Sequence, residues 1–320
     1  MRTSLRAYLA MFIVAAGIVG LGYRAVDRWW ASIGCYPQAP AGYFLAYCAS
    51  PQFGNFEHGA YYYNLEPEAV ASLKRSEVLF FGTSRAQFAL STRKLSDFFA
   101  SLGIAPYLLG FGYNEAGAFP LALIREYELK PKAIVILADP FFRDWSTSHI
   151  RVTQYFRWRV ITELYEYLQK QAFIQVGSRL CGLRPSLCET TDPVVYRSKS
   201  DGWWRPVRFD FARQSAVGQE AAITYTAAMA SADVAFAERF LAATGVSRSC
   251  VVLSAAPSAS VNSDAYVTEM GRLLGVRVSL PRLDGLTSFD GSHLTPASAE
   301  RWSAALLADI GKTVSACAGK

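Results

Sequence analysis

Three residues of this 320-residue chain have the types and spacing that serine-based chemistry requires. Ser84 ends a short apolar run in Glu77–Arg85 (E-V-L-F-F-G-T-S-R), so we expect it at the end of a buried strand. Asp290 and His293 lie three positions apart near the end of the chain, in S-F-D-G-S-H-L-T-P. A serine becomes nucleophilic when a histidine takes its proton and a carboxylate orients that histidine. We therefore expect these three side chains to meet as nucleophile, base and orienting group.

The same chemistry needs hydrogen-bond donors for the oxyanion that develops on the substrate. The amide of Ser84 is one candidate, and the glycine run Gly110-Phe111-Gly112 offers a second at Gly112. Each residue also has a purely structural interpretation. Ser84 can cap a helix, Asp290 can form an Asx turn, His293 can be a surface loop residue, and Gly112 can serve a tight turn. The chemical hypothesis therefore depends on all of them occurring together.

The elements that must position these residues alternate regularly between helical patterns and short apolar runs. Apolar, β-branched runs of this kind are typical of parallel strands buried on both faces. The alternation predicts an α/β fold with a helix-covered parallel sheet and a site at the carboxyl ends of its strands. We expect strands at residues 77–81, 105–112, 132–139, 250–257 and 276–280, helices at 66–75, 91–103, 118–129 and 264–275, and a last helix beginning at Pro296.

The alternation breaks between about residues 141 and 217, which we interpret as an insertion in the same domain. The insertion contains a helical stretch with a broad aromatic face, which either packs on the sheet, lines a substrate groove or meets a membrane partner. Within its polar part, Trp203, Trp204 and Arg205 are the residues most suited to contact a sugar or an anionic ligand.

The first 63 residues are expected to lie outside the main domain, which spans residues 64–320. Residues 31–63 lack a clear period and are interpreted as a linker or wrapping loop, with His58 as a surface or interface residue. Residues 1–30 contain an uncharged run, Ala7–Tyr23, that would span about 25 Å as a helix, near the lower limit for a bilayer core.

A cleaved signal peptide is the competing interpretation of this run, but no suitable cleavage context follows it. We therefore expect a single transmembrane anchor in the inner (cytoplasmic) membrane, with most of the chain in the periplasm.

The cysteine content agrees with an oxidising compartment. The six cysteines are even in number, and six buried thiols are the alternative to disulfides. The chain has three histidines and no C-x-x-C, so we expect neither a zinc site nor any cofactor. The net charge of +6 is not gathered into a dense basic stripe, which argues against nucleic-acid binding. The plausible cysteine pairs are Cys35 with Cys48, Cys181 with Cys188, and Cys250 with Cys317.

Three motifs together resemble the SGNH (GDSL-like) hydrolase and acyltransferase superfamily, whose members carry a serine just after the first strand and a late D-x-x-H. These motifs are F-G-T-S-R, L-G-F-G-Y-N-E-A-G and F-D-G-S-H-L-T-P. The resemblance covers about residues 76–310, interrupted by the insertion. It implies a three-layer, flavodoxin-like sheet, with Ser84, Asp290 and His293 as the catalytic residues.

One departure from the family pattern concerns the oxyanion hole. Family members often carry G-x-N-D after the third strand, and its asparagine donates to the oxyanion. This chain has L-A-D-P there, and an ionised Asp139 cannot donate a hydrogen bond. Asn114 is a substitute donor under this interpretation.

Because an N-terminal anchor is expected before these motifs, the chain also resembles the SGNH proteins that O-acetylate bacterial exopolysaccharides beside a membrane-bound O-acyltransferase. It implies that Ser84 accepts an acetyl group from that membrane partner and passes it to a hydroxyl of a polysaccharide acceptor. Two alternatives stay open: a carbohydrate esterase or deacetylase of the same fold, and a catalytically silent scaffold of a polysaccharide synthesis or export complex.

Overall fold

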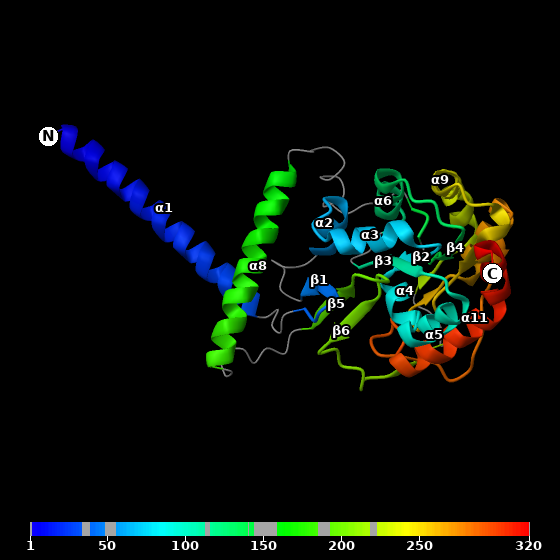
Figure 1. The fold of residues 1–320 in the computed structure, drawn as a ribbon. Coiled ribbons are helices and arrows are strands. Elements are labelled where there is room, and N and C mark those ends of the chain that lie inside the picture. Colours follow the sequence, from blue (N-terminus) through cyan, green and yellow to red (C-terminus); the bar gives the residue numbers. More distant parts are fainter. Residues whose placement is uncertain are drawn as a thin grey trace.

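The protein is built around a five-stranded parallel sheet (Figure 1). The computed structural model describes residues 2–33, 39–48, 56–112, 116–139, 141–143, 159–184, 193–217 and 223–319. Neighbouring strands follow the order β11-β9-β4-β2-β3, and all four pairings are parallel. The strands are β2 (Val78–Thr83), β3 (Pro106–Phe111), β4 (Ala133–Leu137), β9 (Val251–Ser254) and β11 (Arg277–Val278).

Helices cover both faces of this sheet, and each face has its own apolar core. Successive strand residues point to opposite faces, so Leu79 and Phe81 enter one core while Val78 and Phe80 enter the other. The predicted α/β fold with a buried parallel sheet is thus confirmed. The first core is covered by α3 (Pro67–Arg75), α6 (Ala118–Tyr127), α9 (Ala227–Thr244) and α10 (Asp264–Leu274), and the second by α4 (Ser84–Ala89), α5 (Thr92–Leu102) and α11 (Pro296–Ala318).

The strand order places a topological switch point between β2 and β4. Numbered along the chain, the five strands have the order 2-1-3-4-5, which is one of the common doubly wound arrangements. In such sheets the crevice outside the carboxyl ends of the strands at the switch point is the usual ligand site. Ser84 follows β2 directly, and Asp139 lies two residues beyond β4.

A second, antiparallel sheet joins the N-terminal region to the insertion. It has the order β1-β5-β6, with β1 (Tyr43–Cys48), β5 (Val194–Ser198) and β6 (Trp204–Val207). The expectation of a loop over residues 31–63 is wrong where β1 and α2 (Phe56–Tyr62) lie. The hydrogen bonds of β1 come from β5, far along the chain, so no local pattern reveals them. Two short pairings are β12 (Thr287–Ser288) with β7 (Ser215–Ala216), and β10 (Val261–Asn262) with β8 (Ile223–Thr224).

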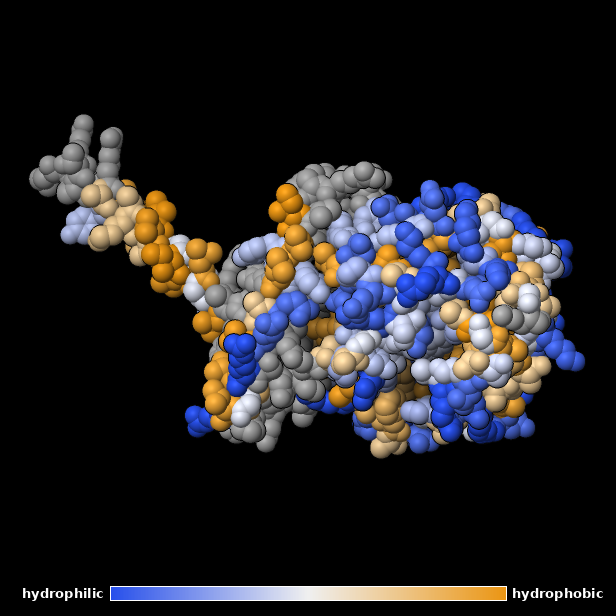
Figure 2. All heavy atoms as spheres, in the orientation of Figure 1, coloured by the Kyte–Doolittle hydropathy of each residue, from blue (hydrophilic) through white to orange (hydrophobic). Residues whose placement is uncertain are grey.

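Helix α1 (Arg2–Ile33) extends away from the sheet and contacts α8 (Arg159–Leu183) (Figure 1). Apolar side chains are exposed on both helices (Figure 2), including Phe12 on α1 and Ile161 on α8. Among the described parts of the chain, no helix is both long and apolar enough to span a bilayer. Within the described residues, the transmembrane helix predicted at Ala7–Tyr23 is therefore not supported.

Disulfides are present, as the cysteine count predicted. Cys250, at the end of the 3₁₀ turn η2 (Arg248–Cys250), is bonded to Cys317 in the last turn of α11. Cys48 and Cys181 are also disulfide-bonded. Their expected partners, Cys35 and Cys188, lie outside the described residues.

Candidate active site

Ser84 is presented by a tight connection between β2 and α4. The strand ends at Thr83, whose side chain accepts a hydrogen bond from the Arg85 amide (3.2 Å) and so caps the helix that Ser84 begins. Gly82 makes the close approach possible, because a Cβ at this position would lie 2.5 Å from the Cβ of Ala86. Ser84 therefore lies at the carboxyl edge of the sheet.

The structure brings the three predicted catalytic residues together. His293 Nε2 lies 2.8 Å from the Ser84 hydroxyl oxygen, and His293 Nδ1 lies 2.6 Å from Asp290 Oδ2. With Nδ1 protonated toward the carboxylate, Nε2 is free to accept the serine proton. Ser84 is part-buried, and the side chains of His293 and Asp290 are 18% and 40% exposed. The arrangement has the geometry of a serine nucleophile with its base and orienting group.

Asp290 also holds the loop that carries His293. Its other oxygen, Oδ1, accepts hydrogen bonds from the amides of Ser292 (2.9 Å) and His293 (2.8 Å). Burial acts to raise the pKa of the Asp290 carboxyl, but the His293 ring and these two amides outweigh burial and lower this pKa. One carboxylate oxygen of Asp290 therefore forms the Asx turn, and the other contacts the His293 ring, as the catalytic interpretation predicts.

Aromatic rings pack around the imidazole of His293. The Phe289 ring stacks on it at a centroid distance of 5.7 Å, and the Phe88 ring lies 4.8 Å away. Two rings follow β6 in the insertion: Phe209 contacts both Phe88 and Phe289, and Phe211 contacts Phe289. The insertion therefore reaches the candidate site and gives the base an apolar wall. Periodicity along the sequence did not reveal this placement, because the contacting rings lie far apart in the chain.

The predicted oxyanion donors are placed less favourably. The amide of Gly112 hydrogen-bonds to the carboxylate of Glu57, so it already has an acceptor, and its role toward the oxyanion stays a prediction. Asn114 lies outside the described residues. The amide of Ser84 is at the first position of α4, where the amides of a helix lack partners within the helix. Of the predicted donors, Ser84 is the one whose described position fits the role.

A buried ion pair behind the glycine run was not foreseen from the sequence. Arg197 on β5 is fully buried and lies 2.8 Å from the Glu57 carboxylate. The guanidinium also donates to the carbonyl oxygens of Gly110 (3.0 Å) and Leu108 (2.6 Å). Glu57 further accepts from Trp204 Nε1 at 3.0 Å. Burial raises the pKa of Glu57 despite the opposing charge of Arg197. This network fastens β3 and the glycine run to the second sheet.

A second ion pair lies beside Ser84. Arg85 donates from its terminal nitrogen Nη1 to Asp139 Oδ2 at 2.9 Å, and from Nε to the Ser292 hydroxyl at 3.2 Å. Asp139 is 1% exposed, and its burial raises the pKa of its carboxyl while Arg85 opposes that rise. The sequence singled out Asp139 as a departure from the family pattern, but no local pattern indicated its partner.

The remaining candidates have structural environments. Trp203 is buried and donates to the carbonyl oxygen of Leu90 (2.9 Å), so its ring packs in the core and is not exposed for the ligand contact that we expected. Arg205 is exposed, with its guanidinium over the Tyr43 ring. His58, expected at a surface or interface, is instead buried between Phe111 and Phe119 because α2 packs on the main sheet.

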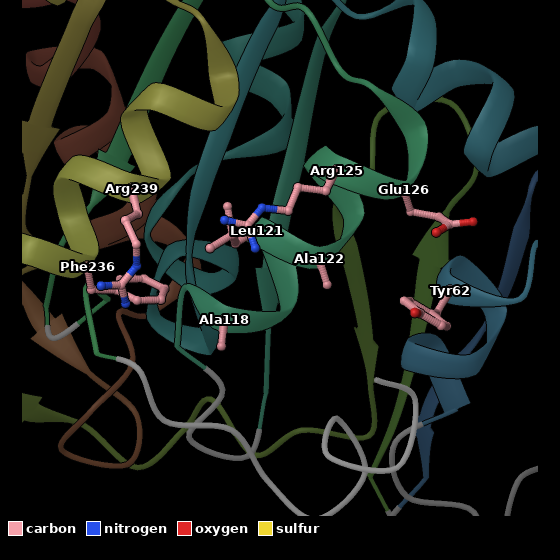
Figure 3. Close-up of a pocket in the computed structure, with 8 residues that line it drawn as sticks. All are labelled: Tyr62, Ala118, Leu121, Ala122, Arg125, Glu126, Phe236 and Arg239. Carbon is pink, nitrogen blue, oxygen red and sulfur yellow. The ribbon is translucent and has the colours of Figure 1, made fainter. Parts of the chain in front are cut away.

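Two of the cavities in the described part of the chain are not lined by the predicted catalytic residues. One of about 500 Å³ is lined by α6, α9 and Tyr62, with Arg125 and Arg239 at its walls (Figure 3). Another of about 580 Å³ lies along residues 255–258 and 280–286. Neither is lined by Ser84, Asp290 or His293. Comparison of the chain with family models, with curated proteins and with solved structures finds no match.

Proposed function

We propose that this protein is a serine O-acyltransferase of the SGNH type that transfers an acyl group, most simply acetyl, to a polysaccharide. The observation that carries the proposal is the continuous hydrogen-bond chain from Asp290 through His293 to Ser84, with contacts of 2.6 and 2.8 Å. The sheet order 2-1-3-4-5, which is flavodoxin-like, and the position of Ser84 at the switch point support the same family.

The proposed reaction has two half-reactions that share one base. In the first, Ser84 Oγ attacks the acyl carbonyl of the donor while His293 Nε2 takes the hydroxyl proton. His293 then gives this proton to the leaving group of the donor, and an acyl ester remains on Ser84. In the second, a sugar hydroxyl attacks the ester, His293 takes its proton, and the proton returns to Ser84 Oγ as the ester bond breaks.

Transfer competes with hydrolysis at the second half-reaction, because water and a sugar hydroxyl attack the same acyl-enzyme. The aromatic rings of Phe88 and Phe289 against His293 favour transfer, since apolar walls lower the local amount of water. An aryl acetate with and without an oligosaccharide acceptor separates the two outcomes. An acetylated oligosaccharide supports transfer, whereas acetate release that no acceptor alters identifies a carbohydrate esterase.

The alternative without catalysis is a scaffold subunit of a polysaccharide synthesis or export complex. In cells, Ser84→Ala and His293→Ala should abolish acylation of the polymer while the protein remains present. If both variants keep normal acylation whereas deletion of the whole protein loses it, the protein acts as a scaffold and the enzymatic proposal fails.

We also infer that the protein works outside the cytoplasm, attached to a membrane through α1, with a membrane-bound O-acyltransferase as its acyl donor. The Cys250–Cys317 disulfide and the exposed apolar side chains of α1 support this location. A reporter enzyme that works only outside the cytoplasm, fused after Lys320, should be active. Deletion of residues 2–23 should release the protein from membranes. An expressed but inactive fusion, or unchanged membrane association, would contradict the inference.

A further inference from the structure

Asp139 occupies a position where an unpaired carboxylate would be costly. It follows β4 at the switch point of the sheet and is 1% exposed. A charge that is withdrawn from water needs a close partner of opposite sign, or it takes up a proton instead. Arg85 is that partner, at 2.9 Å from Oδ2. The pairing makes Asp139 an acceptor, which is the opposite of the donor role that an asparagine has in an oxyanion hole.

The guanidinium of Arg85 joins three parts of the candidate site. Its backbone directly follows Ser84, its Nη1 holds Asp139 after β4, and its Nε holds the hydroxyl of Ser292. Ser292 lies between Asp290 and His293, and its amide is itself fixed by Asp290 Oδ1. The planar guanidinium presents its donors at fixed angles, so the two bonds define both the distance and the orientation of the Ser292 loop. A lysine has one donor centre and cannot reproduce this.

The loop that carries the base needs such a fixed point. It meets Ser84 from more than two hundred positions along the chain, and Asp290 is 40% exposed. Other restraints act on neighbouring residues, where Gly291 O accepts from Ser260 and Phe289 N–H donates to His293 O. The Arg85–Ser292 bond connects the loop directly to the residue after the nucleophile. A shift of about 1 Å in a reacting group costs on the order of 10²-fold in rate.

We propose that Arg85 is a positioning residue that clamps the Asp290–His293 loop against Ser84, with Asp139 as its buried counter-ion. The proposal rests on the proposed role of Ser84 as nucleophile. It also explains why this chain has Asp139 where members of the SGNH superfamily often have the oxyanion asparagine. The Asp139 carboxylate binds Arg85, and other groups donate to the oxyanion.

Asp139→Asn tests this assignment by the sign of its effect. If position 139 belonged to an oxyanion hole, the asparagine would add a donor and the rate of ester cleavage would rise or stay unchanged. As a counter-ion, Asp139 loses its charge in this variant, the remaining amide oxygen holds Arg85 more weakly than the carboxylate does, and kcat should fall by about 10²-fold. Arg85→Gln should cause a similar fall. The double variant should be no slower than the slower single variant, since both remove one clamp.

The full set of variants is assayed in the purified full-length protein with an aryl acetate. KM should stay within about threefold while kcat changes, because the clamp orients catalytic groups and does not bind substrate. Arg85→Lys should be intermediate, and Ser292→Ala should lose about tenfold while keeping the Arg85–Asp139 pair. Arg93→Gln is the matched control, since Arg93 pairs with Glu300 on the surface and should leave the rate unchanged.

A spectroscopic measurement reports the position of the loop even in variants whose stability also changes. The proton shared between His293 Nδ1 and Asp290 should give a downfield NMR signal in the wild type and in Arg93→Gln. It should broaden or vanish in Ser292→Ala and Arg85→Lys, because the loop then moves. The proposal is overturned if this signal and kcat are unchanged in those two variants, or if Asp139→Asn is as fast as the wild type. Failure of the proposed function looks different, since Ser84→Ala would then cleave the ester as fast as the wild type.

Discussion

Replacing Asp290 by asparagine separates the two tasks that the structure gives this side chain. The amide oxygen of the substituted side chain can still accept the amides of Ser292 and His293, which Asp290 Oδ1 accepts at 2.9 and 2.8 Å. The turn should therefore persist. At the other position, a carboxylate oxygen 2.6 Å from His293 Nδ1 becomes an NH₂ donor. The imidazole must then carry its proton on Nε2, facing Ser84, where it cannot act as base.

The expected loss follows from these contacts. A hydrogen bond to a charged group contributes about 1.5–3 kcal/mol, or about 10- to 150-fold in rate at about 1.4 kcal/mol per tenfold change. The unfavourable tautomer adds to this, and a triad aspartate in a buried setting reaches about 10⁴. Because Asp290 is 40% exposed, water competes for these groups, so we expect kcat/KM to fall by about 10³-fold.

The assay compares aryl acetate cleavage by Asp290→Asn with that by Asp210→Asn. Asp210 also accepts a backbone amide two residues ahead, from Ala212 at 2.9 Å, but lies outside the hydrogen-bond chain. Asp210→Asn should be as active as the wild type. A loss of less than tenfold in folded Asp290→Asn would refute the assigned role of the carboxylate in holding the His293 tautomer.

The pH dependence of stability gives an independent check on Asp290. Its pKa in the folded protein is below its ordinary value, so the folded state binds this proton less readily than the unfolded state. The stabilisation is present in full above the ordinary pKa of about 3.9 and is lost as pH falls through the lowered pKa of the folded state. The difference in unfolding free energy between the wild type and Asp290→Asn should therefore shrink as the pH falls below about 4. A difference that stays the same below about pH 4 would contradict the lowered pKa of Asp290.

Three further substitutions test the supporting structure. Glu57→Gln leaves the fully buried Arg197 without its counter-charge, so urea unfolding should show a loss of about 3 kcal/mol; an unchanged midpoint would contradict the buried pair. Gly82→Ala places a methyl group 2.5 Å from the first turn of α4, and should cost about 1–3 kcal/mol of stability together with esterase activity; retention of both would contradict the tight connection. Cys317→Ser removes the Cys250–Cys317 bond, which spans 67 positions, and should lower stability by about 4 kcal/mol in thermal or urea unfolding; unchanged stability would argue against a role of this bond.

The parts of the site that the sequence predicted are those with local signals. The apolar run of β2 ends at Gly82, so Ser84 is recognisable as a residue at a strand end. The D-G-S-H turn before a helix that begins with Pro296 places Asp290 and His293 in a loop. Burial on both faces of the parallel sheet follows from uninterrupted apolar runs.

The parts that the sequence did not predict depend on contacts between distant segments. Glu57 and Arg197 are separated by 140 positions, and nothing near either residue indicates its partner. Strand β1 forms only because β5 supplies its hydrogen bonds. Gly112 was recognised as a residue of close backbone approach, but its amide serves Glu57, which packing alone decides. Likewise, the role of Asp139 became apparent only with Arg85 beside it.

Whether Ser84 carries the acyl group can be decided by mass spectrometry of the full-length protein after brief reaction with an aryl acetate. We predict one acetyl group on the peptide that contains Ser84, which a sugar acceptor removes and which does not form in Ser84→Ala or His293→Ala. Acetylation at another residue, or an equal yield of acetyl-enzyme in His293→Ala, would contradict the assignment of Ser84 as nucleophile and His293 as its base.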